Sequence, residues 1–180
     1  SAALVGLAAV LLAGAPRHSV AWLRWWLASM ALCTAFVGWG FLWQRYASIN
    51  WAAAWFAMGF ATLAAGLLAM ACWPGVRPTP SRWRWRAAMA LLVWAALLHP
   101  VLPLVAGWPL AQAQWVSAAP DPTVLATLGA LLAVHAVPRG GRVLWRCLLG
   151  LGLAWCAISA ATLWTMGSAQ GWTLAALAAG

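Results

Sequence analysis

The stretch FVGWGFLWQRYASINWAAAWFAMGF, from Phe36 to Phe60, predicts the end of one membrane span, a tight turn and the start of the next span. Its strongly polar residues, Gln44, Arg45 and Asn50, lie near the middle, and tryptophan and tyrosine rings surround them. Aromatic rings with a polar edge gather at the headgroup level of a bilayer, where one side is apolar and the other is wet. We therefore expect the chain to leave the membrane here and to re-enter it within a few residues.

The composition extends this interpretation to the whole chain. Of the 180 residues, 66% are hydrophobic and only 6% are charged, whereas soluble domains average about 25% charged residues. All ten basic residues are arginine, and Asp121 is the single acid. We predict an all-α protein, a polytopic transmembrane helix bundle that forms one domain over residues 1–180 and has the lipid bilayer as its first partner.

Apolar runs separated by short breaks predict about seven spans. They cover approximately 2–15, 20–43, 51–73, 87 to the prolines Pro100 and Pro103, 123–137, 143–165 and 172–180. The first and last runs are short or truncated, because a bilayer core of about 30 Å needs about 20 helical residues. Proline removes a backbone donor and clashes with the preceding turn, so the fourth span should kink or end at Pro100.

The arginines predict an orientation. All but one of the ten fall in the first, third and fifth breaks between spans. Cytoplasmic loops carry an excess of basic residues, so the N-terminus is expected outside and the C-terminus inside.

The third break alternates arginine with tryptophan: its residues are Arg82, Trp83, Arg84, Trp85 and Arg86. Alternation of this kind can indicate base stacking on nucleic acid. An interfacial anchor that faces anionic lipid is the simpler interpretation. We therefore expect anionic lipid, and no nucleic acid, as a partner of this segment.

Local patterns predict two helix caps and one packing face. Asn50 should cap the third span, with its side chain accepting a hydrogen bond from an unpaired backbone N–H. Asp121 should cap the fifth span in the same way, with Pro122 at the first helical position. In the third span a small residue recurs at every fourth position, which predicts close contact with another helix, within the chain or in a partner. This stripe consists of Ala53, Ala57, Ala61, Ala65 and Ala69.

His99 and His135 are candidate cofactor ligands, because a polar residue is costly to keep in lipid. Each imidazole could ligate a haem iron or a chlorophyll-type magnesium. One haem held by both is not expected, because their places in the fourth and fifth spans put them about 10 Å apart in depth. The alternatives are a His99 bonded to a carbonyl that the helix break frees, and a His135 at the membrane interface. The four cysteines form no CxxC pair, and we assign no metal site and no cofactor.

No catalytic constellation is present in the sequence. Asp121 cannot supply the two carboxyl groups of paired-acid hydrolysis, and neither a Ser/His/acid set nor a glycine-rich phosphate loop occurs. We expect a protein that is not an enzyme: an accessory or scaffold subunit of a larger membrane complex, for example an energy-transducing one, with other membrane subunits as partners. The alternative is a permease or channel for a small neutral solute, built where the helix breaks at His99–Pro103 and restarts at Pro120–Thr123.

Three groups of residues share a pattern with a known family. The hairpin contributes Gly38, Phe41, Tyr46, Ile49, Asn50, Ala52 and Ala53. The kinked helix and the next helix start contribute Pro100, Gly107, Pro109, Pro120, Pro122, Thr123, Leu128 and Gly129. The last spans contribute Trp155, Ala160, Ala161 and Gly167.

On these residues the chain resembles, over nearly its whole length, the bacterial multi-span membrane family catalogued as domain of unknown function 6064. The resemblance implies a multi-pass protein of the bacterial cytoplasmic (inner) membrane and no particular activity. The chain departs from the family at Leu42, where a histidine is usual, and at Asp121, where a cysteine is usual. It also departs at Gln170, near a usual acid.

Overall fold

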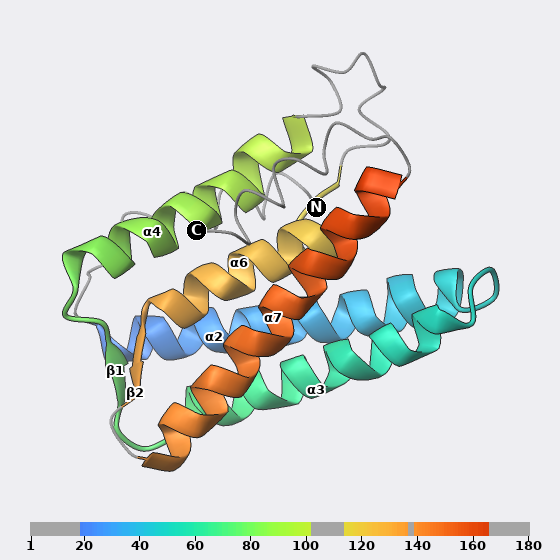
Figure 1. Cartoon of the computed structure of the whole chain (residues 1–180). Helices are drawn as coiled ribbons and strands as arrows, with labels where there is room; N and C mark the ends of the chain where they lie inside the picture. Colours follow the sequence, from blue (N-terminus) through green and yellow to red (C-terminus); the bar gives the residue numbers. More distant parts are fainter. Residues whose placement is uncertain (1–18, 102–113, 137–138, 166–180) are drawn as a thin grey trace.

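The computed structural model describes residues 19–101, 114–136 and 139–165 as a bundle of helices that run back and forth (Figure 1). The first hairpin consists of α2 (Val20–Phe36), its π-helical continuation η1 (Val37–Tyr46) and the returning helix α3 (Ala52–Cys72). The second half consists of α4 (Arg82–Val93), the π-helix η2 (Trp94–Leu98), the 3₁₀ turn η3 (His99–Val101), α6 (Pro120–Leu132) and α7 (Arg139–Thr165).

A short β-ladder interrupts the helices, so the predicted all-α class needs a small correction. Strand β1 (Val76–Pro78) pairs antiparallel with β2 (Val134–Ala136), and Arg77 lies opposite His135. The pairing continues where Thr79 N donates to the carbonyl of Ala133 at 2.7 Å. Strands of three residues are too short for an alternating pattern that sequence could reveal.

Three helices are long and apolar enough to cross a membrane: Val20–Tyr46, Ala52–Cys72 and Arg139–Thr165. The prediction of a helical bundle compatible with a membrane is thereby confirmed, but the count of seven spans is not. The described residues contain five α-helices, and the first and seventh predicted spans lie outside them. Helix α6 has 13 residues and is about 20 Å long, which is shorter than a bilayer core.

Both predicted helix caps differ from the expectation in detail. Asn50 Oδ1 accepts a hydrogen bond from Ala52 N at 3.0 Å, although the cap residue itself is Trp51. Asp121 is not a cap, because Ala119 has the extended cap conformation and Pro120 is the first helical residue of α6. The first of the two nearby prolines, rather than the second, therefore begins this helix.

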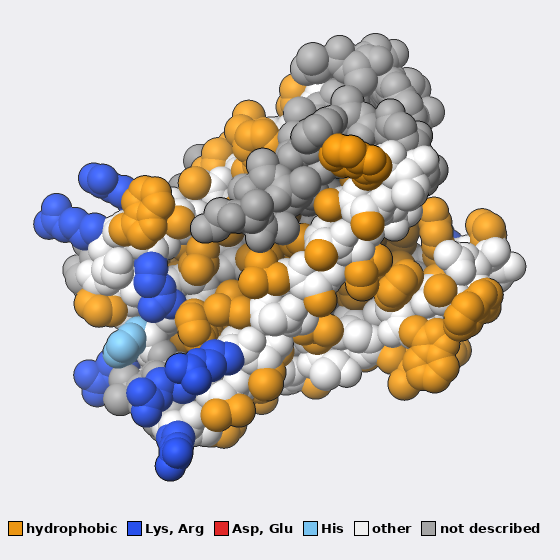
Figure 2. Space-filling model, in the orientation of Figure 1, with side chains coloured by type: hydrophobic (Ala, Val, Ile, Leu, Met, Phe, Trp, Pro, Cys, Tyr) orange, Lys and Arg blue, Asp and Glu red, His pale blue; other side chains and the backbone are white. Residues whose placement is uncertain are grey.

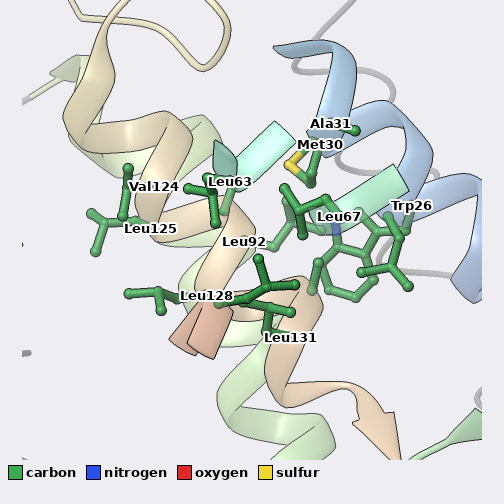
Figure 3. Close-up of a cluster of buried hydrophobic side chains, with 14 of the residues drawn as sticks. Trp26, Met30, Ala31, Leu63, Leu67, Leu92, Val124, Leu125, Leu128 and Leu131 are labelled. Carbon is green, nitrogen blue, oxygen red and sulfur yellow. The ribbon is translucent and has the colours of Figure 1, made fainter. Parts of the chain in front are cut away.

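Helix α6 forms the middle of the hydrophobic core. Every residue from Pro122 to Leu131 is buried, and α6 contacts α2, α4 and α7. Figure 3 shows its leucines facing side chains from α2, α3 and α4. A Cβ on Gly129 would lie 2.8 Å from the carbonyl oxygen of Ala88, so glycine is what lets α6 approach α4 this closely.

The alanine stripe of α3 does not form one packing face within the chain. Ala53 and Ala57 are buried, but Ala61, Ala65 and Ala69 are exposed. Four residues turn a helix by about 400°, so a row at every fourth position rotates by about 40° per step and leaves the contact. The face that packs instead alternates steps of three and four residues: Ala53, Ala57, Phe60, Leu63, Ala64, Leu67, Met70 and Ala71 are buried. Packing of the exposed alanines in a partner stays a prediction.

Candidate functional site

Arginine side chains gather at one end of the bundle, where α2, α4 and α7 begin and β1 pairs with β2 (Figures 1 and 2). We call this the arginine end. Its members are Arg24, Arg77, Arg82, Arg84, Arg86, Arg139, Arg142 and Arg146. Arg45, in the last turn of η1, is the described arginine that lies at the far end. The separation of charge along the bundle that the sequence predicted is therefore present.

The three arginines of the predicted lipid anchor have different environments. Their segment is the first turn of α4, capped by Ser81, rather than a break between spans. Arg82 and Arg86 are exposed, but Arg84 is half-buried. Arg84 Nη2 donates to the Val134 carbonyl at 2.7 Å, and its guanidinium lies 5.2 Å from the centre of the Trp145 ring. Burial lowers the pKa of Arg84, yet a guanidinium stays charged at neutral pH. Arg84 thus fastens α4 to β2 and α7.

Tryptophans pack beneath this end and join α2 to α4. The ring of Trp22 lies 4.9 Å from that of Trp26 and 5.3 Å from that of Trp85. Trp26 is fully buried. These rings are packing residues of the core, whereas Trp83, 77% exposed, has the outward position that a headgroup belt requires.

At the far end lie two polar side chains, His99 and Asp121, which none of the hydrogen bonds between described residues joins. The end of the α4–η3 segment brings in His99, which is 5% exposed and whose Nδ1 has no hydrogen-bond partner among the described residues. The backbone of Gln114 and the side chain of Asp121 are close enough to influence its imidazole. Asp121 in turn accepts a hydrogen bond from Trp155 Nε1 at 2.9 Å.

Two indoles of α7 hold both ends of α6. Trp155 Nε1 bonds Asp121 in the first turn, and Trp145 Nε1 donates to the Leu131 carbonyl in the last turn at 2.8 Å. The two donors are separated by the same number of residues as the two acceptors, so the spacings match along antiparallel helices. The bond to Leu131 also satisfies a carbonyl of the last turn, where intrahelical partners run out.

The candidate cofactor ligands are not brought together. His135 is exposed on β2 at the arginine end, whereas His99 lies at the far end. Within the described ranges, no group of three or more His, Cys, Asp or Glu side chains could hold a metal ion. The exposed position of His135 is compatible with a place at the membrane interface. Within the described residues, neither histidine has the other beside it to share a metal or cofactor.

A cavity for a solute would be expected to include His99 and Thr123. Four of the pockets lined by described residues lie elsewhere and include neither side chain. The hydroxyl of Thr123 instead donates to the Ala119 carbonyl at 2.7 Å and accepts from Ser117 N at 2.9 Å. Its polar group is therefore occupied in shaping the start of α6.

Sequence reasoning missed a row of small residues on α7. The residues that pack against the bundle include Leu148, Gly152 and Cys156, and on the opposite side of the helix small side chains are exposed at steps of three and four. We call these the outward row: Cys147, Gly150, Ala154, Ala157 and Ala161. A Cβ placed on Gly150 would have no neighbour within 4 Å. The same spacing was available in the sequence, but only the structure shows which side of α7 is covered.

No family model, curated protein or solved structure matches this chain. The resemblance to the bacterial membrane family of unknown function therefore stays a prediction, and any function must be argued from the geometry of the molecule.

Proposed function

We propose that this chain is a non-catalytic accessory or scaffold subunit of a larger complex in a bacterial cytoplasmic membrane. The outward row of α7 is the observation that carries the proposal. Of the apolar window of α7 only 17% is buried within the chain, against 44% for the α2–η1 helix and 39% for α3. Lipid supplies no hydrophobic drive for association, so membrane helices associate where small residues let their backbones approach closely.

The outward face of the α2–η1 helix has the opposite character. Trp25, Leu32, Phe36 and Trp39 are each more than 60% exposed there. Large apolar side chains pack against acyl chains and keep the backbones of other helices at a distance. Helix α7 also exposes large side chains, Val143, Leu153, Ile158 and Trp164, but these lie beside or at the ends of the outward row, whose middle consists of small residues. We infer that the first face meets lipid and the second meets another subunit.

Purification of the full chain from its native membranes in mild detergent, followed by native mass measurement, tests this function. We expect the chain to migrate with a larger redox, photosynthetic or transport complex. Recovery only as a free monomer at every detergent strength would contradict the proposal. Flux of a small neutral solute into liposomes that contain the chain, above that of empty vesicles, would favour the permease instead.

A pair of matched variants locates the contact. Ala157→Leu enlarges a residue of the outward row, and Ala35→Leu makes the same change on the exposed side of α2. Neither position is buried, so both variants should fold as the native chain does. We expect only Ala157→Leu to release the chain from the complex. Equal retention of both variants would show that the outward row is not the contact.

The orientation follows from the same proposal and has its own test. We propose that the arginine end faces the cytoplasm, because basic residues are retained on that side. A single cysteine in place of the exposed Trp83, in a chain without its native cysteines, should react with an impermeant thiol reagent only after the membrane is opened. Reaction in intact cells, with the outer membrane made permeable, would reverse the orientation.

A further inference from the structure

A groove runs between the first turns of α2 and the last turns of α3, at the arginine end. Its volume is about 680 Å³. The residues that line it are Val20, Ala21, Arg24, Trp25 and Ala28 from α2, and Leu68, Ala71 and Cys72 from α3. Small side chains of both helices line the groove, Ala21 and Ala28 of α2 and Ala71 of α3, whereas the larger Leu23 and Leu27 are fully buried in the core.

The groove combines one positive charge with apolar walls. Arg24 is exposed, and no side chain in the described ranges forms an ion pair with it. Asp121, the single acid of the chain, bonds Trp155 at the far end. The described residues therefore offer no anion that balances Arg24. Ala28 lies one turn deeper, about 6 Å along the axis of α2 from Arg24, and Leu68 of α3 lines the same groove.

We propose that this groove binds one anionic phospholipid, with the phosphate against Arg24 and an acyl chain between Ala28 and Leu68. A soluble anion would leave the apolar walls exposed, and a zwitterionic lipid would bring no net charge to balance the guanidinium. Basic pockets between membrane helices at the cytoplasmic side are suited to anionic headgroups, which are concentrated in that leaflet. The proposal rests on the membrane location of the chain and is independent of its role as a subunit.

Native mass spectrometry of the full chain, with phosphatidylglycerol or phosphatidylcholine of identical acyl chains, measures the binding. We expect one phosphatidylglycerol to be retained and phosphatidylcholine to be lost. Arg24→Gln should weaken phosphatidylglycerol binding about fivefold, the effect of one arginine near a charged membrane surface. Arg142→Gln removes the same charge from an exposed position of α7 at the same end, which neither lines the groove nor belongs to the predicted lipid anchor. It should leave the binding unchanged.

Ala28→Phe fills the groove without a change of charge and should also abolish retention. An equal loss in Arg24→Gln and Arg142→Gln would reduce the interaction to general surface charge and overturn the proposal. Retention of phosphatidylcholine to the same extent as phosphatidylglycerol, or full retention in Ala28→Phe, would overturn it as well.

Thiol labelling gives a second measurement that needs no variant. Cys72 lines the groove and is exposed, and Cys147 is exposed on α7 outside it. Phosphatidylglycerol in the micelle should slow maleimide labelling of Cys72 but not of Cys147.

Photocrosslinking identifies the occupant of the groove. A photoreactive residue at position 68 should crosslink to lipid. Crosslinking to residues 1–18 in its place would show that the chain itself fills the groove, and would overturn the proposal.

Discussion

Helices α6 and α7 are both apolar, yet most side chains of α6 are buried within the chain and most of those of α7 are not. Helix α6 is buried over every residue from Pro122 to Leu131, because α2, α4 and α7 contact it. Helix α7 is twice as long, and only 17% of its apolar window is buried. Hydrophobicity by itself therefore does not say whether a helix of this chain meets protein or lipid. Side-chain size at each position does, because close packing has strict volume limits and acyl chains do not.

The largest expected effect comes from one substitution made in both helices. Gly129→Leu in α6 would drive a side chain into the backbone of Ala88, since even its Cβ would lie 2.8 Å from that carbonyl oxygen. Overpacking of a core costs about 1–3 kcal/mol when the neighbours can shift, and backbone shifts less readily than a side chain. We expect Gly129→Leu to lose the folded monomer in size-exclusion chromatography.

Gly150→Leu in α7 is the matched control, because a Cβ there meets no neighbour within 4 Å. It should give the native elution profile when the chain is purified as a monomer. If both variants elute as the native chain, the contrast between the two helices is not real.

Helix α3 has a buried face and an exposed face, so the same comparison can be made within one helix. Ala57 is buried beside Gly38, whereas Ala61 and Thr62 are exposed. Ala57→Leu should lower the stability of the monomer by about 1–3 kcal/mol, measured as a lower midpoint of thermal unfolding in detergent. Leucine at Ala61 or Thr62 should change the stability by no more than about 0.5 kcal/mol and leave that midpoint close to the native value. A loss at Ala61 in the monomer would restore the full alanine stripe as an internal contact.

The spans that sequence predicted well are those bounded by breaks on both sides. The third predicted span, 51–73, differs by one residue at each end from α3, Ala52–Cys72. The start of α4 was placed too late because arginines were assigned to a break. Arginine stems can lie along a helix while their charges reach water, and Ser81, whose hydroxyl accepts from Arg84 N, was the overlooked start signal.

Tertiary contacts were beyond the reach of sequence. Asp121 was assigned to a cap on local grounds, but its bond goes to Trp155, 34 residues away. A fully buried short helix such as α6 and a lipid-facing helix have the same apolar composition. This is why α6 was counted as a span. The grouping of arginines at one end was easier to predict from the sequence, because each arginine needs only a position along the bundle axis and not a specific neighbour.

The next largest expected effect concerns the hydrogen bonds that join the indoles of α7 to α6. Trp155→Phe keeps the ring that packs on Phe56 and Phe60 and removes the hydrogen bond to Asp121. Loss of one such bond costs about 1 kcal/mol, so the unfolding midpoint in detergent should fall measurably. Trp83→Phe, at an indole that is 77% exposed, is the control and should change nothing. Trp145→Phe should have a similar effect to Trp155→Phe, and the two effects should add, because the contacts lie at opposite ends of α6.

The smallest effect concerns the outward row of α7. Glycine inside a helix costs about 0.5–1 kcal/mol relative to alanine, because it loses more backbone freedom on folding. Gly150 is exposed and a Cβ there meets open space, so Gly150→Ala should raise the stability of the isolated monomer by up to that amount. Thermal unfolding in detergent measures this gain in stability. Gly129→Ala should instead lower the stability, because its Cβ would lie 2.8 Å from the carbonyl oxygen of Ala88. A loss of stability in Gly150→Ala would mean that residues of this same chain cover the outward row. The row would then be an internal contact, and no surface for a partner would remain on that side of α7.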